Sequence, residues 1–252
     1  DYETVIQQQP STPETPAVDE PLVLRVATTD TPDTKNPITT LGMGSKQVYS
    51  RQVYEVLFDY DQNLEIVPIL AKSWDVSEDG LTWTFKLRPG MKWVNNNGEV
   101  VGDVTAHDFV FGWRELLNPT NAAEYYAFAA VFKNAQAYYD YASGVPGAPE
   151  VKIEDVGFKA VDDLTLVCEL ENVLPYFLQY VKFEVMSPIY EPFYTEVGAD
   201  NYATSPETAL YCGPFYMTDW VLENKITMKK NPAWWDAANV ALDQIEWIKY
   251  TD

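Results

Sequence analysis

The sequence predicts a mixed α/β (α+β) protein, and three patterns support that prediction. Residues 22–28 are rich in leucine and β-branched side chains and lead to turn formers at Asp30 and Pro32, as in a buried strand. Residues 81–88 alternate apolar and polar side chains with a period of two, which is typical of a strand with one buried face. Residues 105–118 have helical spacing, so strands and helices alternate along the chain.

The helix at residues 105–118 begins with a capping pattern. Thr105 is followed three positions later by Asp108, whose carboxylate can accept from the backbone N–H at the start of the helix. An apolar stripe at Phe109, Trp113 and Leu116 follows.

Three further helical segments are predicted. Ser45 can cap a helix that runs to Phe58, and aromatic residues suggest a second helix from about 121 to 142, before a loop at 143–150 rich in glycine and proline. A shorter helical segment is expected around residues 188–200.

Strands return in the second half of the chain. Two hairpin strands are expected across residues 158–170, with a turn at Asp162 and Asp163. The stretches GPFYMTDW, ITMKKN and IEWIKY are three more strand candidates.

Length and composition limit the classes of function. A chain of 252 residues with 46% hydrophobic content can build one substantial core or two modest ones. Its 38 acidic against 17 basic residues give a formal charge of -21, which would repel nucleic acid. There is no apolar run long enough for a membrane span and no signal-peptide pattern. Residues 1–20, rich in proline and threonine, are predicted to form a disordered linker.

Residues that could support catalysis or metal binding are few. Cys168 and Cys212 lack zinc-site spacing, and they form either one disulfide or, the favoured interpretation, two buried thiols. The single histidine, His107, has no evident partner and is expected at the surface or in a cap. No nucleophile-elbow or phosphate-loop glycine pattern occurs. We therefore expect no catalytic residues, no metal and no cofactor.

A short acidic stretch imitates the start of a calcium loop. Asp59, Asp61 and Asn63 have the right alternation, but Leu64 stands where that loop requires glycine. A hairpin turn is the favoured interpretation.

Aromatic residues make up 14% of the chain and need burial. Most are expected in the core, and the remainder could line a cleft for sugars or peptide side chains. This composition favours a binding protein over an enzyme.

The region from residue 66 to residue 119, IVPILAKSWDVSEDGLTWTFKLRPGMKWVNNNGEVVGDVTAHDFVFGWRELLNP, resembles the hallmark region of family 5 extracellular solute-binding proteins. A later pair of segments, GPFYMTDW and KKNPAWW, resembles that family as well. The resemblance covers the chain from about Leu22 to its end.

The resemblance implies a periplasmic-binding-protein-like fold with two lobes. Residues 21–45 and 155–252 would form lobe one, residues 46–154 an inserted α+β domain, and the second lobe would be missing. By position, the implied ligand-binding residues are Gly42, Met43, Gly44, Tyr125, Cys212 and Gly213.

The function implied by the resemblance is the capture of oligopeptides for an ABC transporter. The partners would be a peptide ligand and a membrane permease, and the protein would be a monomeric, extracytoplasmic lipoprotein. Alternatives are an oligosaccharide or metal-complex receptor of the same family and, from another class, a secreted glycosidase with paired carboxylates.

Overall fold

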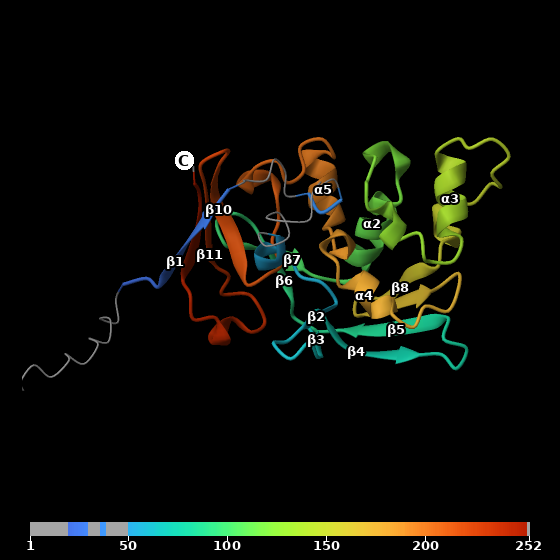
Figure 1. The fold of residues 1–252 in the computed structure, drawn as a ribbon, viewed down its shortest axis with the longest axis horizontal. Coiled ribbons are helices and arrows are strands. Elements are labelled where there is room, and N and C mark those ends of the chain that lie inside the picture. Colours follow the sequence, from blue (N-terminus) through green and yellow to red (C-terminus); the bar gives the residue numbers. More distant parts are fainter. Residues whose placement is uncertain (1–19, 30–35, 39–49, 251–252) are drawn as a thin grey trace, which may run out of the picture.

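The computed structural model describes residues 20–29, 36–38 and 50–250. Within these ranges the strands form two four-stranded sheets and two short hairpins. Figure 1 shows the sheet that contains β1, β10 and β11 at one end of the molecule and the sheet that contains β4, β5 and β8 toward the other. The mixed α/β prediction is confirmed.

The first sheet joins the start of the chain to its end. Its order is β1 (Val23–Thr28), β12 (Gln244–Lys249), β11 (Lys225–Lys230) and β10 (Phe215–Val221). β1 is parallel to β12, whereas β12, β11 and β10 are antiparallel neighbours. The predicted first strand and the three C-terminal strands are thereby confirmed.

The second sheet has the order β4 (Ala71–Val76), β5 (Thr82–Leu87), β9 (Thr165–Glu169) and β8 (Phe158–Asp162), all antiparallel. The strand expected at residues 81–88 and the later hairpin are confirmed. The expected domain boundary at 154/155 cuts between strands of this one sheet, because β9 pairs directly with β5.

The two short hairpins are β2 (Phe58–Tyr60) with β3 (Ile66–Pro68), and β6 (Lys92–Val94) with β7 (Val100–Asp103). The first is closed by Asp61, whose Oδ1 accepts backbone N–H groups two and four residues further on, at 2.8 and 2.9 Å. The acidic stretch is thus a hairpin turn, as the sequence favours.

The helices are α2 (Ala106–Leu116), α3 (Ala135–Ala142), α4 (Phe177–Val181) and α5 (Glu191–Val197), and residues 50–53 are also helical. The helix predicted at 105–118 and the segment around 188–200 are confirmed. α2 begins with the predicted capping box.

Two helix predictions need correction. The helix expected to reach Phe58 ends at Val53 within the described residues, and Phe58 starts β2 instead. In the stretch from 121 to 142 only α3 is an α-helix. Ala122 and Asn134 have left-handed backbone (φ 47° and 60°), which interrupts a right-handed helix despite favourable side chains nearby.

The buried aromatic residues gather around Trp113 of α2. Its ring lies 4.9 Å from Phe132 and 5.7 Å from Phe158, centroid to centroid, so α2 packs on β8. Phe132 in turn lies 5.8 Å from Phe177 of α4, which continues the core toward β5. Most aromatic side chains lie in the core or pack against it, as expected.

Candidate functional site

Two of the predicted site residues lie in a tight corner where distant segments meet. The Val53 carbonyl, at the end of the helical residues 50–53, accepts the backbone N–H of both Cys212 (3.1 Å) and Gly213 (2.9 Å). A single acceptor therefore ties the turn before β10 to the helical segment. The predicted residues Gly42, Met43 and Gly44 precede that segment and lie outside the described residues.

Glycine at position 213 is required by the close approach of two backbones. A Cβ atom there would lie 2.7 Å from the Val53 carbonyl carbon and 2.9 Å from the Gln52 oxygen. No side chain fits in this space, so the sequence can bring these segments together only with glycine.

Further hydrogen bonds hold the corner from two other sides. Tyr211 and Val94 exchange backbone hydrogen bonds at 2.8 and 2.9 Å. The Asn231 side chain donates to the Gly213 carbonyl at 2.9 Å, and its backbone N–H donates to the Pro214 carbonyl. The N–H groups of Cys212 and Gly213 thus donate to an acceptor within the protein, the Val53 carbonyl.

Cys212 is 1% exposed, and burial raises the pKa of its thiol well above the usual value. Cys168 is also buried with a raised pKa, for the same reason. Both cysteines are free, which confirms the favoured interpretation of two buried thiols.

A carboxyl group that the sequence did not single out borders this corner. The half-buried Glu55 accepts a hydrogen bond from the Trp234 indole at 2.9 Å. Burial is the main cause that raises the pKa of Glu55 to about 8; the nearby Asp59 raises it further, and the Trp234 hydrogen bond and Arg51 lower it. No local pattern marks Glu55, because its partner lies far away in the chain.

Tyr125 is placed in a different cluster. It caps a short 3-10 turn at Tyr126–Phe128 and is half-buried, with its ring 6.3 Å from that of Phe128. Tyr125 is therefore the predicted site residue, among those described, that keeps a partly exposed side chain.

The one histidine of the sequence lies at the surface, and the described residues meet the requirements of neither a metal site nor a membrane span. His107 is exposed, with its Nε2 3.6 Å from Asp163 Oδ1. Among the described residues, no group of three or more His, Cys, Asp or Glu side chains is arranged to hold a metal ion. No helix within the described ranges has the length and apolar character to cross a bilayer.

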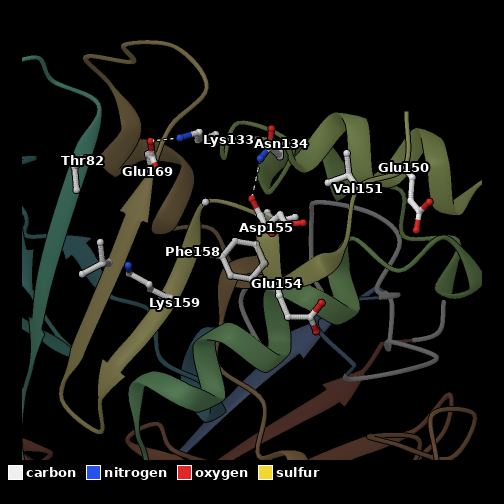
Figure 2. Close-up of a pocket in the computed structure, with 13 residues that line it drawn as sticks. Thr82, Lys133, Asn134, Glu150, Val151, Glu154, Asp155, Phe158, Lys159 and Glu169 are labelled. Atoms are coloured by element: carbon white, nitrogen blue, oxygen red, sulfur yellow. Dashed lines mark hydrogen bonds and ion pairs between the residues drawn. The ribbon is translucent and has the colours of Figure 1, made fainter. Parts of the chain in front are cut away.

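A polar cavity of about 720 Å³ opens beside β8 and β9, at the start of α3 (Figure 2). Lys133 forms a 2.5 Å ion pair with Glu169 at its rim, and Asn134 donates to the Asp155 carbonyl. The cavity lining includes none of the predicted site residues.

Comparison with known proteins places the chain in a family. Residues 65–252 match the pattern of the bacterial extracellular solute-binding proteins, family 5, so the chain belongs to that family.

The sequence relatives are binding proteins by name. The oligopeptide-binding protein AmiA of Streptococcus pneumoniae is 35% identical over 195 residues, which are 77% of this chain and 28% of the relative. The dipeptide-binding protein DppE of Bacillus subtilis is 33% identical over 202 residues, 79% of this chain and 34% of the relative. The chain thus spans well under half the length of these relatives.

Solved structures likewise resemble most of this chain, which covers less than half of each of them. The substrate-binding domain of an oligopeptide ABC transporter from Bacillus anthracis has a TM-score of 0.79 and 38% identity, covering 91% of this chain and 42% of that one. OppA of Haemophilus influenzae, in complex with RPPGFSPFR, has a TM-score of 0.80 and 28% identity, with 92% and 43% covered.

Proposed function

We propose that this chain is part of an oligopeptide receptor that delivers its ligand to an ABC transporter and catalyses no reaction. The observation that carries the proposal is the likeness of 92% of the chain to a binding protein in complex with a peptide, at a TM-score of 0.80. Relatives named for oligopeptide or dipeptide binding support the same ligand class.

In this proposal, Gly42, Met43 and Gly44 offer backbone groups to the peptide, and Tyr125 contacts it directly. Extended peptides present main-chain hydrogen-bonding groups whatever their sequence, so such contacts bind many peptides. Cys212 and Gly213 act indirectly, because their N–H groups hold the segment that follows residues 42–44.

The proposed domain arrangement is a first lobe with an inserted domain, and a second lobe beyond this sequence. We propose one change to the expected boundaries, in which residues 155–169 go with the inserted domain; the pairing of β9 with β5 supports it. Ligand would favour a closed arrangement of the lobes by bridging them. We further propose a monomer, tethered outside the cytoplasm as a lipoprotein and recognised by a membrane permease.

The test is calorimetric titration of the protein at its full natural length with oligopeptides, a maltodextrin and a nickel complex. Micromolar or tighter binding of peptides of unrelated sequence, with no heat from the other two, is the expected result. Binding of the sugar or the nickel complex without peptide binding would overturn the proposal. Native mass spectrometry of the purified protein would identify any ligand retained from the cell.

A further inference from the structure

The turn between β6 and β7 contains three consecutive asparagines followed by a glycine: Asn95, Asn96, Asn97 and Gly98. Gly98 is the only glycine in the sequence that directly follows an asparagine. Glycine has no Cβ to shield its backbone nitrogen, so this nitrogen can approach the side-chain amide of the residue before it. The turn is therefore a place where the chain can react with itself.

The three asparagine side chains have different surroundings. Asn95 Oδ1 accepts the backbone N–H groups of Asn97 at 2.9 Å and of Glu99 at 3.0 Å. Asn95 Nδ2 donates to Glu99 Oε2 at 2.8 Å, so hydrogen bonds hold both ends of this amide. Asn96 is half-buried, and the residue that follows it has a Cβ. Asn97 is exposed, and its side chain forms no hydrogen bond within the described part of the chain.

Gly98 occupies the position that this kind of turn reserves for glycine. Its φ is 78°, and its N–H donates to the Asn95 carbonyl at 2.9 Å. A Cβ atom at Gly98 would lie 2.9 Å from Tyr216 Oη, so the turn rests against β10. The Gly98 nitrogen must leave the Asn95 carbonyl before it can react, and the folded turn therefore slows the reaction.

A second turn with the same backbone provides an internal comparison. Gly80, between β4 and β5, has a φ of 73° and donates its N–H to the Ser77 carbonyl at 2.9 Å. The preceding Asp79 carboxylate accepts from the Ser77 hydroxyl and the Leu81 backbone N–H. The Ser77 hydrogen bond is the main cause that lowers the pKa of Asp79, so this carboxylate stays ionised and resists nucleophilic attack.

We propose that Asn97 is a site of spontaneous deamidation. The Gly98 nitrogen forms a bond to Asn97 Cγ, the Cγ–Nδ2 bond breaks, and ammonia leaves with the proton of the Gly98 N–H, which closes a succinimide ring. Water then opens the ring at one of its two carbonyl groups, and the products are aspartate and isoaspartate. Both products add a negative charge, and isoaspartate also brings the Cβ atom into the backbone of the turn.

The modified residue lies close to the corner at Cys212 and Gly213. Val94, at the end of β6, exchanges backbone hydrogen bonds with Tyr211, the residue before Cys212. The inference concerns the chemistry of the turn and does not depend on which ligand the protein binds.

The experiment incubates the protein at its full natural length at 37 °C in buffers from pH 6 to pH 9. Peptide mass spectrometry follows the mass increase of about 1 Da that deamidation causes, and fragmentation locates it. We expect Asn97 to react at least about tenfold faster than Asn95 or Asn96. The rate should rise with pH, because the attacking nitrogen must lose its proton.

Asn97→Ser should abolish the modification, and Asn96→Ser, one position earlier in the same turn, is the matched control that should keep the wild-type rate. An enzymatic assay for isoaspartate should detect this residue at position 97. The peptide with Asp79 and Gly80 should stay free of it over the same period.

A synthetic peptide of residues 92–103 sets the time scale, because it contains the same Asn-Gly pair without the fold. An unmodified Asn97 in the protein after this peptide has reacted completely would overturn the inference. So would equal modification of the three asparagines, or the same rate in Asn97→Ser as in the wild type. Thermal unfolding of both variants checks that the fold around the turn is retained.

Discussion

The indole N–H of Trp234 donates to the Glu55 carboxylate at 2.9 Å, although 179 residues separate the two in the chain. The bond joins the loop after β11 to the segment before β2. The same turn after β11 carries Asn231, whose side chain donates to the Gly213 carbonyl, so this turn holds the candidate corner through two side chains.

Glu55 should make stability depend on pH. Burial raises its pKa from 4.5 to about 8, so the folded state binds this proton more tightly than the unfolded state. Its contribution to stability is therefore complete below pH 4.5 and is lost as the pH rises toward about 8. Glu55→Gln stays neutral and still accepts from Trp234. We expect the melting temperature of this variant to rise relative to the wild type between pH 5 and pH 8.5.

Urea or thermal unfolding at several pH values, with both proteins in the same buffers, measures this difference. The other titratable groups contribute equally to the stability of both proteins, so their effect cancels in the comparison. A difference that stays constant across the range would show that the Glu55 carboxyl keeps an ordinary pKa in the folded protein.

Asp108 should be a strong determinant of the stability of α2. Its Oδ2 accepts the Thr105 backbone N–H at 2.8 Å and the Trp93 indole at 3.1 Å. Asp108→Ala removes the acceptor of both hydrogen bonds and leaves a buried indole donor unpaired, so the free energy of unfolding should fall by about 2 kcal/mol. The control is His107→Ala, one position earlier and exposed, which should leave the denaturation midpoint unchanged. Equal behaviour of the two variants would contradict this account of the cap.

Local patterns in the sequence predict the cap and several strands, because their partners are close by. Thr105 and Asp108 are three residues apart, and the alternation in β5 reports its own buried face. The pairing of Val23 with Gln244, and of Glu55 with Trp234, depends on the folded chain and leaves no local trace.

The helix expected from 121 to 142 is shorter than predicted because of its backbone. The left-handed backbone at Ala122 and Asn134 stands among residues that favour helix, so tertiary packing overrides local preference there. The family resemblance points to the turn with Cys212 and Gly213, whereas the hydrogen bonds from its N–H groups to the Val53 carbonyl appear only in the structure.

The two thiols should be unreactive in the folded protein. Cys168 and Cys212 are buried, and burial raises the pKa of both, which disfavours the reactive thiolate. A chromogenic thiol reagent at pH 8 should release almost no colour from native protein and two equivalents per chain in denaturant. Rapid reaction of one thiol under native conditions would show that its burial is transient, and Cys212→Ser and Cys168→Ser would identify which one.

Gly213→Ala should disrupt the candidate corner more than an ordinary glycine substitution. The new methyl group would lie 2.7 Å from the Val53 carbonyl carbon, and backbone atoms cannot move aside as a flexible side chain can. We expect a loss of roughly 2 to 3 kcal/mol in the free energy of unfolding. Gly90→Ala is the comparison: its φ of 81° is strained for alanine, but nothing lies within 4 Å, so it should cost only about 1 kcal/mol.

The difference between the two variants in the free energy of unfolding therefore separates the cost of the close approach at Gly213 from the cost of backbone strain. If Gly213→Ala is as stable as Gly90→Ala, the segments at Val53 and Gly213 can separate without cost. The corner would then not hold the turn at Cys212 and Gly213 tightly against the helical residues 50–53.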